Sequence, residues 1–264
     1  MNAPASQASE HIPVLLYHSI AAEPAESIAP FSLDPDEFAR HLDAIESSGR
    51  RAVDFSELAR LLGDGDDLSN LVCVTFDDGW RDNIAACAAM SARSLPATVY
   101  VTSDFLGRDG MLSETELLEL AAIAGTEIGA HSVGHPRLDE IPRESMIAEI
   151  TQSKQRLEAT LDREVASFAY PHGAYDAHVR KAVIDAGFSS AAAVKNALSH
   201  PSDDRFGVAR WTVMRHHDAA EIEAVLAGRG APIAWPGQRL RTRGYRAVRR
   251  LRHRLAARRE GTPA

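Results

Sequence analysis

Two adjacent carboxylates, Asp77 and Asp78, follow an apolar run of strand-forming residues in LVCVTFDDGW at residues 71–80. Residues 71–76 are apolar and too few for a helix, so we expect a strand buried on both faces. Neighbouring carboxylates are costly to ionise together, unless one binds a cation while the other moves a proton. The alternative is a plain Asp-Asp-Gly turn in which Asp78 caps the following helix.

Two histidines, His131 and His135, are four residues apart directly after a short expected strand at residues 126–130. On a helical turn, this spacing would point both imidazoles in the same direction, as a shared metal ion requires. A carboxylate from another strand end, Asp78, would complete a His-His-Asp set with positions left open for water and substrate. Asp77 would then be the neighbouring base that takes a proton from the attacking water.

Two further segments follow expected strands. His18 comes directly after residues 12–17, and a lone histidine at such a place is either structural or a proton donor. The turn formed by Tyr170, Pro171, His172 and Gly173 could offer backbone N–H groups to a developing oxyanion. A proline-glycine turn without a catalytic role explains these four residues equally well.

The elements that must position these side chains alternate between strands and helices. We expect strands at residues 12–17, 51–53, 71–76, 97–101, 126–130, 165–169, 189–194 and 207–213. We expect helices from residue 35 to the glycine at 49, after residue 80, and at residues 55–62, 113–123, 142–161, 176–186 and 219–226. About seven strand–helix units in about 215 residues indicate a single domain of class α/β, a barrel of parallel strands.

Composition excludes several classes of protein. Apolar residues make up 45% of the chain and charged residues 25%, which is typical of a globular domain. No apolar run is long enough to span a membrane, and no basic, apolar leader begins the chain, so we expect a cytoplasmic protein. Cys73 and Cys87 are expected to be small buried side chains, with a disulfide as the less favoured alternative.

The charge is distributed unevenly. Residues 239–260 hold ten Arg and one Glu, about +9, which leaves about −17 for the rest of a chain of net charge −8. An acidic body does not favour nucleic acid as a partner. The basic segment has apolar residues at mostly helical spacing, so it could reach the inner face of a membrane or a partner, or remain a solvated tail. We divide the chain into a flexible N-terminus (1–11), a catalytic domain (12–228) and a basic tail (229–264).

With these motifs in place, the chain resembles the polysaccharide deacetylases, family 4 carbohydrate esterases with the NodB-homology fold, over residues 12–227. TFDDG (75–79) matches the first family motif and HSVGH (131–135) the metal motif, while FAYPHG (168–173) resembles the third motif that lines the groove. The resemblance implies a distorted (β/α)7-type barrel, Asp77 as the base, and a divalent metal on Asp78, His131 and His135. Zn²⁺ is expected first, and this mixed ligand set also accepts Co²⁺, Ni²⁺ or Mn²⁺.

The sequence departs from the family pattern in two places. Ala169 stands where the third motif usually has the arginine that braces the catalytic aspartate, and Arg210 is our candidate for that brace. No clear late Leu-x-His motif supplies the general acid, and the nearest residues are His216 and His217. The chain is more similar to members of exopolysaccharide synthesis with permuted motifs, whose opening segment resembles LLYHS (15–19) and whose histidine there, His18 in this sequence, acts as the acid.

The resemblance implies removal of N-acetyl groups from an amino-sugar glycan or glycan precursor. Within the same fold, the alternatives are a deformylase acting on a lipid-linked amino sugar and an amidase acting on a cyclic ureide. An alternative from another class is an inactive glycan-binding module without metal.

Overall fold

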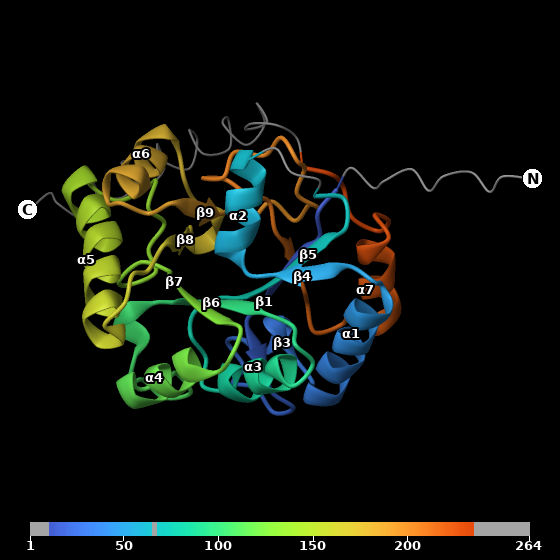
Figure 1. Ribbon diagram of the computed structural model, residues 1–264. Coiled ribbons are helices and arrows are strands. Elements are labelled where there is room, and N and C mark those ends of the chain that lie inside the picture. The colour runs from blue at the N-terminus through green and yellow to red at the C-terminus, as the bar shows by residue number, and fades with distance from the viewer. Residues whose placement is uncertain (1–10, 65–67, 235–264) are drawn as a thin grey trace, which may run out of the picture.

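The computed structural model describes residues 11–64 and 68–234, and within them the chain forms a large parallel sheet surrounded by helices (Figure 1). Seven strands follow one another in the order β10-β1-β5-β6-β7-β8-β9, and β4 pairs with the beginning of β5. The strands are β1 (Val14–Tyr17), β4 (Arg51–Val53), β5 (Leu71–Phe76), β6 (Ala97–Val101), β7 (Thr126–Ala130), β8 (Ser167–Ala169), β9 (Ser190–Ala192) and β10 (Trp211–Thr212).

The helices are α1 (Pro35–Ser47), α2 (Phe55–Asp64), α3 (Asn83–Ser91), α4 (Glu114–Ala122), α5 (Arg143–Leu161), α6 (Ala177–Asp185) and α7 (Ala219–Leu226). Local sequence sets several of their first residues. Asp34 accepts the first free N–H of α1 at Asp36, and capping boxes begin α4 at Ser113 and α7 at Asp218. None of the helices in the described residues is long and apolar enough to cross a membrane.

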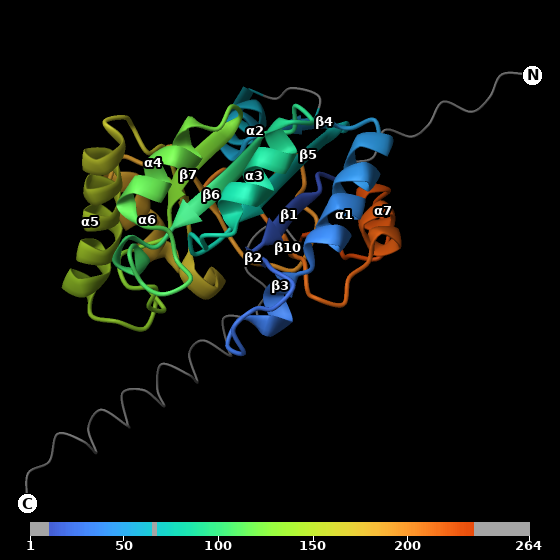
Figure 2. The same cartoon turned by 90° about the horizontal axis from the view of Figure 1, so that it is seen from below.

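The sheet curls back on itself. The first strand pairs with the last, with Leu15 opposite Trp211, and a parallel bridge joins Val208, shortly before β10, to Ala192 of β9. Connections between neighbouring parallel strands run through helices on the outside, among them α1, α3, α4 and α5 (Figures 1 and 2). The expected α/β class with a distorted barrel of parallel strands is confirmed.

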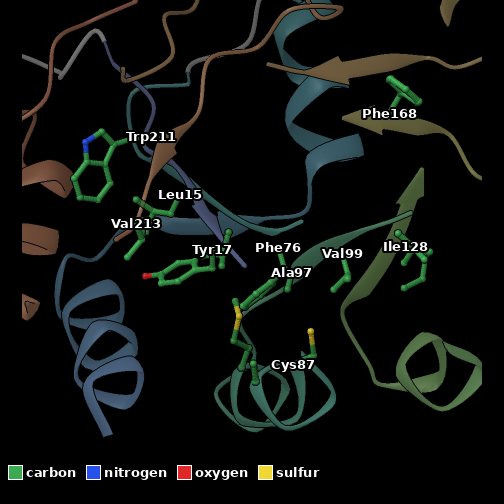
Figure 3. Packing of buried hydrophobic residues seen from close by; sticks show 14 of the residues in the cluster. Leu15, Tyr17, Phe76, Cys87, Ala97, Val99, Ile128, Phe168, Trp211 and Val213 are labelled. Atoms are coloured by element: carbon green, nitrogen blue, oxygen red, sulfur yellow. The ribbon is translucent and has the colours of Figure 1, made fainter. Parts of the chain in front are cut away.

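Alternation along each strand divides the side chains between two faces. Outward-facing residues form the larger core beneath the helices, where the rings of Tyr17 and Phe76 lie 5.6 Å apart and Cys87 of α3 faces the sheet (Figure 3). Inward-facing residues form a second cluster with α2, in which Phe55 meets the ring of Tyr100 edge-on. The helix α2 therefore closes one end of the barrel, and the other end is left for a site.

A partly buried carboxylate fixes α2 in that position. Glu127 of β7 accepts hydrogen bonds from the N–H and hydroxyl of Ser56, from the hydroxyl of Thr98 and from the hydroxyl of Ser167. The first turn of α2 and two neighbouring strands therefore share one acceptor inside the barrel.

Several expectations differ from the structure in detail. The last strand is two residues long, against the expected 207–213, because only Trp211 and Thr212 pair with β1, while Val208 forms an isolated bridge with Ala192. A small parallel sheet of β2 (Ser19–Ile20) and β3 (Ser32–Leu33) is not evident from the sequence (Figure 2). Both cysteines are free and buried. Residues 232–234 bond to Leu198, and the expected basic helix at 239–260 lies outside the described residues.

Candidate active site

The candidate site lies at the carboxyl ends of the strands, opposite α2. Asp77 follows β5, His131 follows β7, and His18 follows β1. Each has the inward position in its strand's alternation, because Phe76, Ala130 and Tyr17 pack in the outer core. The alternation therefore brings side chains from three strands to one end of the barrel.

Asp77 is held by a buried arginine that directly precedes the last strand. The two terminal nitrogens of Arg210 donate to Oδ1 and Oδ2 of Asp77 over 2.7 and 2.8 Å, and one also donates to the hydroxyl of Thr75. Arg210 is fully buried and its guanidinium lies over the ring of Tyr100. Burial opposes ionisation of Asp77, but Arg210 and His131 outweigh it and hold its pKa at about 2. The residue expected to brace Asp77 thus contacts it through two bonds.

Asp78, the next residue, lies in a strained turn. Its φ of +77° lies in the left-handed region, which Asp tolerates better than most residues, and Gly79 follows with φ +87°. The indole N–H of Trp80 donates to Oδ2, whereas Oδ1 is buried and has no hydrogen-bond partner. Burial raises the pKa of Asp78, His18 opposes this and Asp77 adds to it. The two carboxyl groups are therefore pushed apart in pKa, which suits different roles.

His131 and His135 converge, but not on a helical turn as the spacing suggested. Ser132 and His135 have φ of +65° and +61°, and the serine hydroxyl accepts the N–H of His135. Glu149 of α5 accepts the N–H groups of Val133 and Gly134, which fixes the loop. The loop that brings the two histidines together is held by a residue outside the motif, and the sequence gave no signal of this role for Glu149.

The ring nitrogens of the two histidines are ready to bind a cation. Their Nε2 atoms are 3.1 Å apart, and Nδ1 of His131 donates to the carbonyl of Ala169 over 2.8 Å, which leaves Nε2 with its lone pair. Burial lowers the pKa of His131 to about 3 and also lowers that of His135, so both rings are neutral. A neutral imidazole is the form that ligates metals.

The donor set fits a metal ion. One ligand atom from each of Asp78, His131 and His135 lies within 4.8 Å of the others, and Oδ1 of Asp78 is 3.7 and 3.5 Å from the two Nε2 atoms. That Oδ1 is the buried atom without a hydrogen-bond partner. An unpartnered carboxylate oxygen facing two imidazole lone pairs is costly unless a cation lies between them. The three residues thus form a candidate metal centre of one oxygen and two nitrogens.

A cleft of about 770 Å³ lies over this centre. Its lining includes both aspartates, both histidines of the metal motif, and Leu16, His18, Ser27, Ile28, Phe31, His172, Val194, Asn196, Trp211, Thr212, Met214 and His217. The ring of His18 lies 5.2 Å from that of Phe31, which is 37% exposed at the cleft. His18 is therefore close enough to the cleft to contact a bound substrate.

The turn at Tyr170–Gly173 is used differently from the expectation. Tyr170 has the outward position after β8, so its side chain is buried against Tyr175 and bonds to the carbonyl of Phe206. The N–H of Tyr170 bonds to Ala192, that of Gly173 bonds within the turn, and Pro171 has none. These three residues do not supply the expected oxyanion donors in this structure. His172, with φ +56°, lines the cleft 4.3 Å from the ring of His135.

His216 and His217, which follow the last strand, differ in their surroundings. His216 is exposed, whereas His217 lines the cleft, stacks on Trp211 with ring centroids 4.5 Å apart, and accepts the N–H of Met214 at Nδ1. Asp218 caps α7 as expected. His217 therefore lies at the cleft with its Nδ1 already engaged.

The sequence model of the polysaccharide deacetylases matches residues 64–191. This match places that segment in the polysaccharide deacetylase family. The segment carries both aspartates, both histidines of the metal motif and the turn after β8.

Two individual relatives match parts of the chain. YxkH of Bacillus subtilis strain 168 is 25% identical over 179 residues, which cover 67% of this chain and 62% of that protein. The uncharacterized protein SCO4760 of Streptomyces coelicolor is 27% identical over 120 residues, 46% of each chain. The chain thus matches less than two thirds of the length of either relative.

Solved structures share the fold. The deacetylase PplD of Streptococcus pyogenes, in complex with acetate, has 21% identity and a TM-score of 0.73 over 80% of this chain and 96% of that one. IcaB of Ammonifex degensii has 23% identity and a TM-score of 0.71 over 83% and 97%. A de-N-acetylase of Aggregatibacter actinomycetemcomitans has 14% identity and a TM-score of 0.70 over 81% and 98%. At these identities the likeness establishes the fold.

Proposed function

We propose that this chain is a metal-dependent hydrolase that removes N-acetyl groups from an amino-sugar glycan or glycan precursor. The observation that carries the proposal is the placement of Asp78, His131 and His135 around a common point beside the arginine-bound Asp77, on the floor of an open cleft. The family match of residues 64–191 supports the same reaction class.

The three ligands would hold a divalent cation, with Zn²⁺ first and Co²⁺, Ni²⁺ or Mn²⁺ also suited to one carboxylate and two imidazoles. A bound cation would polarise the amide carbonyl and lower the pKa of water. The chain itself contributes the orientation of the ligands, through the carbonyl that accepts from His131 Nδ1 and the glutamate that holds the loop.

Asp77 is the proposed base. Its low pKa keeps it ionised at neutral pH, and the bidentate contact with Arg210 fixes both oxygens. Oδ2 of Asp77 lies 3.7 Å from Nε2 of His131, so a proton acceptor lies next to the metal ligands. Asp77 would orient the attacking water and take its proton.

His18 is the proposed acid. The departing nitrogen of an amide must be protonated, because an amine anion is too basic to leave at neutral pH. His18 lines the same cleft as Asp77 and follows a different strand. His217 is the rival, but its Nδ1 accepts a backbone N–H and its ring stacks on Trp211.

The acyl group is proposed from the relatives. PplD is described in complex with acetate, and another neighbour of the same fold is described as a de-N-acetylase. Both descriptions favour an acetyl group over a formyl group, and the family match favours a glycan over a cyclic ureide as the substrate.

The test is a panel of N-acetylated and N-formylated amino sugars, as monosaccharides and oligomers, incubated with metal-loaded protein and analysed by mass spectrometry. We expect products that have lost acetyl groups, and we expect Asp77→Asn to abolish them while metal content persists. Loss of formyl groups alone would replace the proposed reaction with deformylation. Binding of an oligomer without any turnover by metal-loaded protein would indicate a glycan-binding module.

A further inference from the structure

Three consecutive residues that begin with His18 are tied to two consecutive residues at the start of α3. The side-chain amide of Asn83 donates to the carbonyl of His18 over 2.8 Å. The hydroxyl of Ser19 and the N–H of Ile20 donate to the two oxygens of Asp82 over 2.6 and 3.0 Å. Asn83 is fully buried, so these contacts form part of the interior.

Asp82 does not cap α3, although it occupies the N-cap position of that helix. It is the N-cap residue of α3, where an aspartate ordinarily accepts an N–H of the first helical turn and stabilises the helix by about 1 kcal/mol. Here its side chain makes no capping bond, and its oxygens accept from Ser19, Ile20 and Asn83. Because the side chain of Asp82 does not cap α3, we infer that it stabilises another element.

The element it serves is the end of β1. Nδ1 of His18 is buried and has no hydrogen-bond partner, so no bond at this atom fixes the orientation of the ring. The ring of His18 lies against that of Phe31. Its place therefore depends on the backbone that carries it. The backbone around His18 is joined to the segment after β5 at two places. The N–H of Asp77 donates to the carbonyl of Tyr17, and Asp82 and Asn83 make the contacts described above.

We propose that Asp82 and Asn83 are positioning residues that hold His18 at a fixed place relative to Asp77 across the cleft. The inference rests on the proposed function, in which His18 protonates the departing nitrogen. The same seven-residue segment, 77–83, would then carry the base, a metal ligand and the anchor of the acid. Loss of the anchor would displace the acid without touching the metal.

The test uses Asn83→Asp, which keeps the size of the side chain and removes the amide that donates to His18. The control is Asn70→Asp, because Asn70 donates the same kind of bond to the carbonyl of Gly49 at an exposed site. The probes are a pentamer of N-acetylglucosamine and 4-nitrophenyl acetate. Nitrophenolate leaves as an anion and needs no acid, so the ester reports the metal and base alone.

We expect Asn83→Asp to lower kcat on the pentamer by ~100-fold, with KM and metal content unchanged, and ester hydrolysis by less than ~3-fold. In a His18→Ala background, Asn83→Asp should add less than ~3-fold, because the group it positions is already gone. Asn70→Asp should match the wild type on both probes. Asp82→Asn should show the same selective loss on the amide, and it serves as the second variant if Asn83→Asp does not fold.

Two results would overturn the inference and are distinguishable. Equal losses on amide and ester, or an undiminished effect of Asn83→Asp in the His18→Ala background, would mean that the contacts only support folding, while the proposed function stands. Unchanged amide hydrolysis by His18→Ala itself would remove the acid role from His18, and the proposed assignment would fail together with the inference.

Discussion

Replacement of Arg210 by methionine should destabilise the protein far more than replacement of a surface arginine with the same geometry. Arg210 and Asp77 form a bidentate pair with side chains 0% and 3% exposed. Removal of one partner leaves an uncompensated buried charge, which costs about 3–5 kcal/mol. Independently, a pKa of about 2 against an ordinary 3.8 corresponds to roughly 2–3 kcal/mol. The two figures agree in scale.

The assay is urea unfolding of metal-free protein at several pH values. Because the pKa of Asp77 is depressed in the folded state, its contribution is present above pH 3.8 and is lost as pH falls through about 2. Without Arg210, burial would raise the pKa of Asp77, so the difference in free energy of unfolding between wild type and Arg210→Met should be largest near neutral pH and shrink as pH falls towards about 2. Arg210→Lys should restore part of it, since one ammonium cannot replace the two-pronged contact.

The matched control is Arg180→Met. Arg180 also makes two bonds to one carboxylate, Asp204, but both side chains are more than a third exposed, so the loss should stay below about 1 kcal/mol. If Arg210→Met costs no more than Arg180→Met, the buried pair contributes nothing and our account of how Asp77 is held is wrong.

Three further predictions concern the proposed acid, Glu127 and the basic segment at residues 239–260. His18→Ala should lower amide hydrolysis by ~100-fold and His217→Ala should change it little; the reverse order would transfer the acid role to His217. Glu127→Ala should reduce the free energy of unfolding in urea by about 2–4 kcal/mol, because four donors lose their acceptor, and a change under 1 kcal/mol would contradict this. Deletion of residues 239–260 should abolish sedimentation with anionic vesicles and leave turnover of a soluble substrate unchanged. Each Arg near an anionic surface contributes about 1 kcal/mol of binding free energy. If the intact protein does not sediment with such vesicles at low salt, this membrane contact is excluded.

Much of the fold follows from local sequence. The strands at Leu71–Phe76, Ala97–Val101 and Thr126–Ala130 have the expected bounds, because short apolar segments between turn residues leave no other choice. Helix starts at Asp34 and Ser113 follow from capping chemistry. The two-residue strands β2, β3 and β10 were not predictable, because two residues are too few to show the alternation of side chains that marks a strand.

The site was less predictable than the fold. Because side chains alternate along a strand, Tyr170 points outward once Ala169, the last residue of β8, is known to face inward. The sequence alone did not show which way Ala169 faces. The left-handed turn at Ser132 has no sequence signature, and it is held by Glu149 from a helix. Contacts such as that of Asn83 with His18 join residues far apart in the chain, so no local pattern encodes them.

The central claim is that Asp78, His131 and His135 hold one divalent cation on which hydrolysis depends. The direct measurement is a titration of chelator-stripped protein with Zn²⁺ or Co²⁺, with bound metal and acetate release from the N-acetylglucosamine pentamer recorded together. We expect both to rise in parallel to one cation per chain, and we expect neither to rise in His135→Ala. Full hydrolysis by protein verified as metal-free, or tight cation binding that persists in His135→Ala, would contradict the account.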